Sequence, residues 1–308
     1  MRGDRRRAAG LAGGAARLTA TAIPLLAVCA GIGAAVAGGG GAVAGAVAGV
    51  VVLAAVGAYC DRLALSAMLA RPVSEVEHPE LYRLVRELSK GGRLPVPRLY
   101  LSPAEQPNSF AVGLNPRSAT ICCTEGLLKS LDEAELRGVL GHELAHVSGR
   151  DTLPATVAAG VATVITFPAG LSRLLPARAP AGAPAVRASA ARGPGASGLG
   201  LVEATLMLVL GPVAALVIRL SVTREREYRA DAAGALLAGD PVALASALRK
   251  IEAGTTELAL APDARLSSVG HLMIASPFRA EGFARLFGTH PPAGERIRRL
   301  EALAGYRR

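Results

Sequence analysis

The sequence predicts an α+β fold, mainly α-helical, in a polytopic membrane protein. Hydrophobic residues make up 51% of the 308 residues and aromatic residues only 3%, and there are 36 glycines. That balance is unusual in a soluble protein of this length. Long apolar stretches occur in two pairs, one near the N-terminus and one near the middle of the chain. The segments between and after them have the apolar periodicities of short strands and amphipathic helices.

The first region, residues 1–60, combines a basic arm with two candidate membrane helices. Residues 18–38 and 42–60 contain no charged side chain, and each is long enough as a helix to cross about 30 Å of hydrocarbon. A cleaved secretory signal also begins with arginines and an apolar run, but here a second stretch follows at once. Small residues spaced four apart favour close helix packing in a membrane. Three glycines have this spacing at the start of the second stretch: Gly41, immediately before it, and Gly45 and Gly49 within it.

Basic residues predict the orientation of these helices. They lie on both flanks of the pair and are absent from the turn between the two stretches. Because short loops rich in Lys and Arg stay in the cytoplasm, we expect the polar domain on the cytoplasmic side of the cell membrane. These clusters also explain the formal charge of +10, and the scarcity of aromatic residues speaks against a nucleic-acid binder. The flanking residues are Arg2, Arg5, Arg6, Arg7, Arg17, Arg62, Arg71 and Lys90.

The second region, residues 61–152, has the patterns of a small β-sheet with helices. Pro79 at a first-turn position and apolar residues at helical spacing predict a helix over 80–88. Runs of β-prone residues predict three strands, of which the last two form a hairpin at Asn115-Pro116. The expected strands are 98–101, 110–114 and 119–124.

The segment His142-Glu-Leu-Ala-His146 carries the strongest chemical signal in the chain. Asp132 and Glu135 form a predicted capping box before apolar residues at helical spacing, so the segment is expected on a helix. Both imidazoles then lie on one face, where they can bind one Zn²⁺ beside Glu143 as the general base. A helix that merely repeats His is the alternative, but only five His occur in the chain. The pattern predicts a zincin-like domain that holds one Zn²⁺ and hydrolyses peptide bonds.

Two imidazoles leave a catalytic zinc one protein ligand short. The last region, residues 219–308, offers Glu225, Glu227 and Asp231 on a polar helical segment, and a His₂Glu set is an established arrangement. A solvated, ion-paired helix face is the alternative for such a charge run. Spacing does not choose between Glu225 and Glu227. Further helices are expected over 232–253 and 295–303.

Residues 153–218 hold the second pair of apolar stretches, 153–172 and 199–218, around a linker rich in Ala, Pro, Gly and Arg. Two crossings, or none, would return the chain to the side of the zinc helix. We expect four spans in total. Two spans with an interfacial or protruding helical hairpin are the alternative, because four arginines are unusual in a short external loop. They are Arg173, Arg178, Arg187 and Arg192.

Four separated segments resemble the HtpX family of heat-shock membrane zinc metalloproteases, which are bacterial relatives of the CAAX prenyl-protein proteases. They occur in the family's order between about Pro72 and Tyr306, with the stretch near 176–198 excepted. The segments are Pro107-Asn-Ser-Phe-Ala-Val-Gly113, His142-Glu-Leu-Ala-His-Val-Ser-Gly-Arg-Asp-Thr-Leu153, Arg226-Glu-Tyr-Arg-Ala-Asp231 and Thr289-His-Pro-Pro-Ala-Gly-Glu-Arg-Ile297.

This resemblance implies roles for residues outside the zinc helix. It implies that Glu227 is the third zinc ligand and that Asp231 orients a ligand imidazole, as metal-bound His usually requires. It also implies that His290 stabilises the oxyanion and that Arg296 forms an ion pair nearby. A loop histidine before two prolines is the structural alternative for His290.

The resemblance also implies a place for the substrate. Asn108, Ser109, Phe110 and Ala111 match a family segment expected to hold an extended peptide as an added β-strand. Main-chain hydrogen bonds of that kind give affinity with little sequence demand. A plain hairpin strand is the alternative interpretation of these residues.

The function implied is that of a membrane-bound zinc endopeptidase in protein quality control, acting on misfolded or unassembled membrane proteins. A prenyl-protein protease is the nearer alternative, although the sequence identifies no prenyl-binding chamber. A non-catalytic membrane scaffold is the other, but structural zinc usually has four protein ligands rich in Cys. None of the four cysteines lies near the zinc helix in the sequence.

Overall fold

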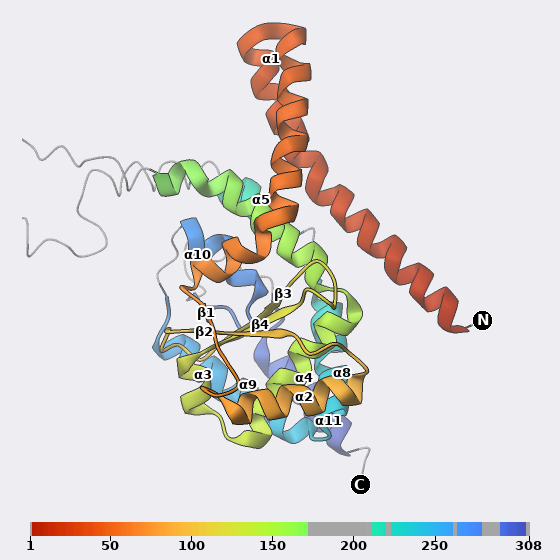
Figure 1. Cartoon of the computed structure of the whole chain (residues 1–308), viewed down its shortest axis with the longest axis vertical. Helices are drawn as coiled ribbons and strands as arrows, with labels where there is room; N and C mark the ends of the chain where they lie inside the picture. The colour runs from red at the N-terminus through yellow and green to blue at the C-terminus, as the bar shows by residue number, and fades with distance from the viewer. Residues whose placement is uncertain are drawn as a thin grey trace, which may run out of the picture.

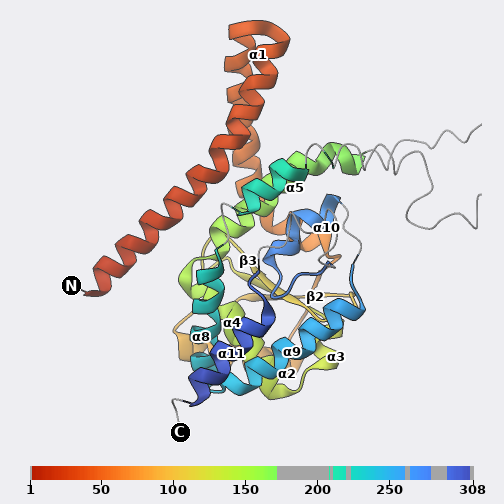
Figure 2. The same cartoon turned by 180° about the vertical axis from the view of Figure 1, so that it is seen from behind.

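The structure is a computed structural model, and it describes residues 2–171, 208, 211–219, 223–260, 264–278 and 290–305. An apolar helical hairpin projects from a polar α+β domain, and helix α5 (Thr152–Leu171) lies where the two meet (Figure 1 and, from behind, Figure 2). The four linker arginines predicted between the central apolar stretches lie outside the described residues. Of the stretch 199–218, residues 208 and 211–218 are described.

Helix α1 (Arg2–Ala67) turns back on itself. Ala37 and Gly38 leave helical geometry, with φ of −143° and 63°, and Gly38 takes a left-handed φ that glycine adopts at no steric cost. Figure 1 shows the chain reversing at the tip of the hairpin. The two predicted apolar stretches are therefore separate helical arms, and the turn lies slightly before the glycine run at 39–41 where the sequence placed it.

The two arms touch backbone to backbone. A Cβ added at Gly41 would overlap the carbonyl oxygen of Gly33, and one at Gly45 would overlap that of Cys29. Close approach of this kind gains dispersion contacts that larger side chains would prevent. The predicted role of the glycine spacing in close packing is confirmed.

One described helical stretch, Gly33–Val56, is long and apolar enough to cross a membrane by length and composition, and it runs through the turn. Val43, Val47 and Val51 on it are exposed. Helix α5 contains a shorter apolar stretch, Thr152–Thr166. The prediction of four spans stays a prediction.

Helix α5 packs along the second arm of α1 and against the helical residues 211–219. Where α5 meets α1, Gly160 leaves room for the side chain of Val56. A Cβ added at Gly160 would lie 2.5 Å from Val56 Cγ1. Small and β-branched residues fill the rest of this apolar bundle. Its buried members are Val56, Cys60, Ala158, Val161 and Val217.

The sheet has the strand order β1-β2-β4-β3. The three predicted strands and the hairpin are confirmed: β2 (Arg98–Ser102) pairs parallel with β4 (Thr120–Thr124), and β4 pairs antiparallel with β3 (Ser109–Val112). Strand β1 (Arg71–Pro72) was not predicted, because two residues ending in proline carry no periodic signal. Strand β3 is an edge strand of the sheet, and it lies beside helix α4, which carries the His142–His146 motif.

The predicted helices are found, with one correction. The expected continuous helix over 232–253 is two helices, because Gly239 takes φ 86° and Asp240 caps the next helix through its side chain. The capping box of Asp132 and Glu135 is confirmed. The helices are α2 (Pro79–Gly92), α3 (Glu125–Ser130), α4 (Glu133–Gly149), α8 (Arg224–Ala238), α9 (Pro241–Glu257), α10 (Ala264–Val269), the 3₁₀ turn η2 (Gly270–Leu272) and α11 (Ala293–Gly305).

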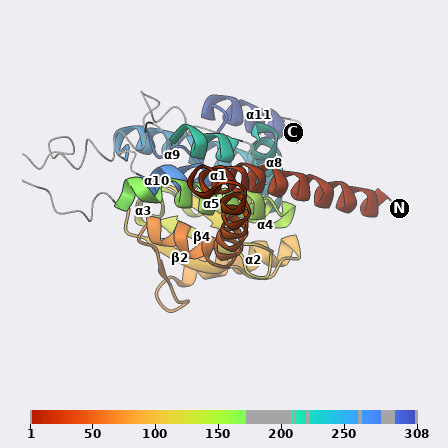
Figure 3. The same cartoon turned by 90° about the horizontal axis from the view of Figure 1, so that it is seen from above.

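Helix α4 lies at the centre of the polar domain. The sheet and α2 lie on one side of it, and α8, α9 and α11 lie on the other (Figure 3). Its approach to α8 is unusually close: a Cβ at Gly141 would lie 2.6 Å from the carbonyl oxygen of Gly234, and one at Gly234 would lie 2.5 Å from the amide nitrogen of His142. Glycines at this crossing let side chains of both helices reach one point.

We expect Gly234→Ala to push α8 away from α4, since its new Cβ has no room beside the His142 backbone. Overpacking typically costs about 1 to 3 kcal/mol, so both the melting temperature and the metal content of the purified protein should fall. Gly91→Ala in α2 is the control, because its Cβ would meet only the end of the Leu237 side chain at 3.4 Å. Equal melting temperature and metal content in the two variants would contradict the close crossing.

Candidate metal centre

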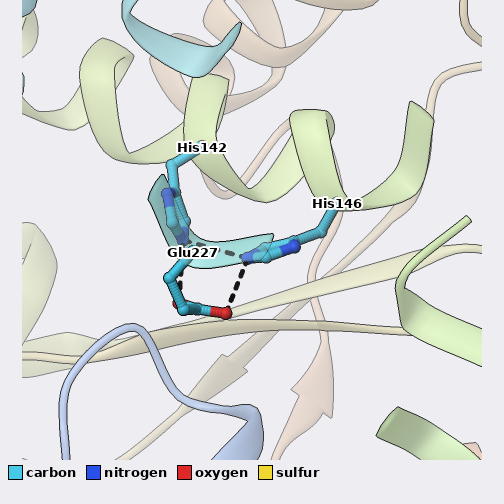
Figure 4. A group of neighbouring side chains, drawn as sticks. All are labelled: His142, His146 and Glu227. Atoms are coloured by element: carbon cyan, nitrogen blue, oxygen red, sulfur yellow. Dashed lines mark hydrogen bonds and ion pairs between the residues drawn. The ribbon is translucent and has the colours of Figure 1, made fainter. Parts of the chain in front are cut away.

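Three side chains from two helices converge on one point. His142 and His146 project from one face of α4, and Glu227 projects from the first turn of α8 (Figure 4). One ligand atom from each lies within 4.8 Å of the other two. The two imidazole Nε2 atoms are 3.1 Å apart, and the Glu227 carboxylate oxygens lie 3.6 Å from His146 Nε2 and 4.0 Å from His142 Nε2. Ligand atoms about 2.0–2.1 Å from a tetrahedral zinc are roughly 3.3 Å apart, so this spacing suits one ion.

Each imidazole has a carboxylate beside its Nδ1 atom, on the side away from this point. His142 Nδ1 lies 2.9 Å from an oxygen of Asp231, and His146 Nδ1 lies 3.7 Å from an oxygen of Asp151. A carboxylate beside Nδ1 favours the tautomer with its proton there, which leaves the lone pair on Nε2. Two Nε2 lone pairs and the Glu227 carboxylate then face one another, an arrangement that a cation between them stabilises.

The charges around this group also favour a cation. Buried charges are costly unless they are compensated. The group contains four acidic side chains and two guanidiniums, so acidic groups outnumber guanidiniums by two, an imbalance that a divalent ion would offset. The carboxylates belong to Glu143, Asp151, Glu227 and Asp231, and the guanidiniums to Arg226 and Arg296; Asp151 is partly exposed and the other five residues are buried.

The pKa values agree with a ligand role for the carboxylate. Burial alone would raise the pKa of Glu227, but the charge of His146, a contact with His290 and the charge of Arg296 hold it well below its ordinary value. Burial alone would lower the pKa of His146, but Glu227 and Asp151 raise it. Glu227 is therefore ionised at neutral pH, as a metal ligand must be.

Asp231 is held by Arg296 on its far side. The guanidinium donates two parallel hydrogen bonds to the carboxylate, from Nε at 2.8 Å and from Nη2 at 2.7 Å, and Nη1 donates a third to the Ile274 carbonyl at 2.6 Å. Burial alone would raise the pKa of Asp231, but Arg296 and His142 lower it. The structure thus places Asp231 and Arg296 in one buried chain of contacts that ends at His142.

The other predicted residues also lie at the site, in different positions. Glu143 is buried beside His142 and lines the same cavity, and its carboxylate accepts a hydrogen bond of 2.6 Å from the Ser109 hydroxyl. His290 Nδ1 lies 3.4 Å from Glu227, and its Nε2 is buried with no hydrogen-bond partner among the described residues. Glu225 is exposed, away from the group that includes Glu227.

Sequence analysis missed three residues at the site. Arg226 Nε lies 2.9 Å from Asp151, so this pair lies behind His146. His271 is buried in the cavity wall with Nε2 3.2 Å from the Ala155 carbonyl, and burial lowers its pKa to about 4. The sequence held a weak signal for each of them. Asp151 and Arg226 lie next to motif residues, and His271 is one of only five His. No spacing rule, however, predicts that these three residues lie at the metal centre.

The chain itself occupies the outer edge of β3. Residues 273–277, here called the cover segment, run antiparallel to residues 106–110 in constant register. The contacts include an isolated β-bridge, one main-chain hydrogen bond of 2.9 Å, two hydrogen bonds of 3.0 Å donated by side-chain amides, and one of 3.4 Å from the Ala275 amide to Asn108 Oδ1. The pairs are Phe110 with Met273, Ser109 with Ile274, Asn108 with Ala275 and Gln106 with Pro277.

Asn108, Ser109, Phe110 and Ala111, which the family resemblance implies for substrate binding, are all buried. At the other end of β3 the Gly113 amide donates to the Thr156 hydroxyl of α5 at 3.2 Å. The cavity between the edge and the three convergent side chains has a volume of about 30 Å³. That is enough for an ion or a water but not for a peptide. The cover segment and the β3 residues that it pairs with lie more than 160 residues apart in the sequence, so no local pattern could predict this pairing.

Comparison with known proteins places this geometry in a family. The sequence matches peptidase family M48 over residues 75–304. A protease HtpX homologue of Kineococcus radiotolerans is 54% identical over 249 residues, which cover 80% of each chain. One from Paenarthrobacter aurescens is 49% identical over 246 residues, covering 80% of this chain and 79% of the other.

A solved structure, Ste24p of S. mikatae, is 19% identical with a TM-score of 0.38, and the match spans 75% of this chain and half of that one. The family assignment rests on the sequence matches, and the M48 match over residues 75–304 includes all the segments that converge at the candidate metal centre. The chain belongs to peptidase family M48, among the HtpX proteases, and is a metallopeptidase.

Proposed function

We propose that this protein is a membrane-bound zinc endopeptidase that cleaves misfolded or unassembled membrane proteins from the cytoplasmic face. The observation that carries the proposal is the convergence of His142, His146 and Glu227 beside the buried carboxylate of Glu143. We assign the first three as ligands of one Zn²⁺. When bound there, zinc would polarise the scissile carbonyl and lower the pKa of a water.

The chain's own residues move the protons. Glu143 accepts a proton as water attacks the scissile carbonyl, and it then returns a proton to the leaving amine. His290, which lines the cavity beside Glu227 and whose Nε2 has no hydrogen-bond partner among the described residues, stabilises the oxyanion. Asp231, held by Arg296, fixes the His142 ring in the tautomer that a ligand needs.

Glu143→Gln should lose nearly all cleavage of unfolded casein while it keeps its zinc, because the change removes the base without removing a ligand. Glu133→Gln on the same helix is the control, since Glu133 is exposed and its ion pair with Arg83 contributes little. Casein turnover and metal content would be measured on both purified proteins. Near-normal turnover by Glu143→Gln would refute the assignment, and so would normal activity of the parent protein after zinc removal.

Glu227→Ala should lower the zinc content sharply, because it removes one of three protein ligands. Glu225→Ala is the matched control two residues earlier on α8, where the side chain is exposed. It should leave metal content almost unchanged. Zinc would be measured per chain after dialysis, and loss of zinc from the second variant alone would transfer the ligand role to Glu225.

The membrane part of the proposal rests on the apolar segments. Residues 1–60 and 153–218 are proposed to anchor the chain as a multi-pass protein, and 61–152 with 219–308 to form the cytoplasmic peptidase domain. The exposed valines of the α1 hairpin support contact with lipid. The first turn of α5 contributes Thr152 and Ala155 to the cavity wall, so the site opens close to the apolar bundle.

A reporter that is active only in the cytoplasm should work when fused after Arg71 and after Arg308, because basic residues flank the hairpin on both sides. A fusion after Gly39, at the tip of the hairpin, is the control and should activate only a reporter that requires export. Activity of the export-dependent reporter after Arg71 or Arg308 would overturn the cytoplasmic orientation.

An extended substrate is proposed to pair with β3 over Ser109–Ala111. Zinc proteases commonly bind substrate as an added strand, and the position of this edge next to Glu143 supports such pairing here. The cover segment holds the same edge. Substrate entry therefore requires that residues 273–277 move away from β3.

A further inference from the structure

Ser109 places a hydroxyl on the proposed general base. The side chain is fully buried on β3, and its Oγ donates to Glu143 Oε1 at 2.6 Å. A hydrogen bond this short to a carboxylate is of the charge-assisted kind, which is roughly twice as strong as a neutral one. Among the described residues, no other group forms a hydrogen bond with the Glu143 carboxylate.

Hydrogen bonds and strand pairing set the position of the Ser109 backbone. The Ser109 carbonyl accepts from the Ile274 amide at 2.9 Å, and the Ser109 amide donates to the Asn108 side chain at 3.2 Å. On its other side Ser109 lies opposite Cys123 in the pairing of β3 with β4. The contacts with Asn108 and Cys123 lie within the β3–β4 pair and do not depend on the cover segment, so they keep Ser109 beside Glu143 when residues 273–277 move away.

The two oxygens of Glu143 are therefore not equivalent. Glu143 lines the cavity and Ser109 does not, so Oε1 is directed toward β3 and Oε2 remains for the reacting water. The Ser109 hydroxyl donates its hydrogen bond to Oε1, which makes that oxygen less basic than Oε2. Oε2 is therefore the favoured oxygen for a proton taken from water, and from there the proton can pass to the leaving amine.

We propose that Ser109 is a positioning residue, whose hydroxyl holds Glu143 so that Oε2 takes and returns the proton. This rests on the proposed function, because it takes Glu143 to be the base. The proton balance is that of the hydrolysis itself: water gives one proton to Oε2, its oxygen bonds to the carbonyl carbon, the C–N bond breaks, and the proton passes to the amine nitrogen. Ser109 keeps its own proton throughout.

Two isosteric pairs test the hydroxyl. Ser109→Ala should lower kcat by about 10-fold or more, the scale of one hydrogen bond to a charged group, with KM and zinc content unchanged. Ser109→Thr should retain most of kcat, whereas Ser109→Val, of nearly the same shape, should show the loss. The Thr and Val pair keeps the test informative if Ala at this position prevents folding.

Ser102→Ala is the matched control. Ser102 is also a fully buried strand serine with a hydrogen bond of 2.7 Å, but it donates to the Met68 carbonyl and does not line the cavity. Its loss should lower the melting temperature without changing kcat or KM. A fall in kcat of the same size in Ser102→Ala would mean that the Ser109 effect is structural.

A stability cycle gives a readout that does not depend on activity. Ser109→Ala should lower the melting temperature by about 3 °C or more in the parent protein, and should have little effect in a Glu143→Ala background. Equal shifts in both backgrounds, or equal kcat in the Thr and Val variants, would overturn the proposal. An active Glu143→Gln protein would instead overturn the proposed function, so the two failures are distinguishable.

Discussion

The close crossing of α4 and α8 is the constraint on which the candidate site depends. His142 and His146 come from one helix and Glu227 from the other, so their ligand atoms meet only if the two backbones approach within reach of short side chains. Gly141 and Gly234 permit that approach, and the capping box at the start of α4 sets where the helix begins. The chemistry of the site therefore rests on two residues that have no side chain to contribute.

Charge compensation explains why so many polar residues are buried around this crossing. Arg296 binds Asp231 through two hydrogen bonds, and Asp231 contacts His142; behind the other imidazole, Arg226 is paired with Asp151. Each ligand imidazole thus has a carboxylate behind it and each of these carboxylates has a guanidinium. The remaining charge, on Glu143 and Glu227, lies at the point where a divalent cation would bind. The ion pairs orient the ligands, and the metal would complete the neutralisation.

Short-range sequence patterns predicted most of the helices and strands, and they predicted the two histidines of the site but not its third ligand. The zinc helix, its cap, the β3–β4 hairpin and the glycine packing of α1 follow from short-range rules, and the structure agrees. Spacing did not distinguish Glu225 from Glu227 as the third ligand, because the choice depends on which face of α8 packs against α4. The break at Gly239 was missed because apolar residues continue at helical spacing on both sides of it. The cover segment was beyond any sequence pattern, since its pairing with β3 joins residues far apart in the chain.

Strand β3 contacts the proposed base and forms the proposed substrate edge within one short stretch of backbone. Its inner side pairs with β4, the Ser109 hydroxyl holds Glu143, and its outer side pairs with the cover segment. The cover segment reaches the metal centre a second time, because the Ile274 carbonyl accepts from Arg296, which binds Asp231 behind His142. A movement that frees the edge of β3 must either break the bond between Ile274 and Arg296 or carry Arg296 with it. The edge of β3 and the support of His142 therefore share one residue, Ile274, through its amide and its carbonyl.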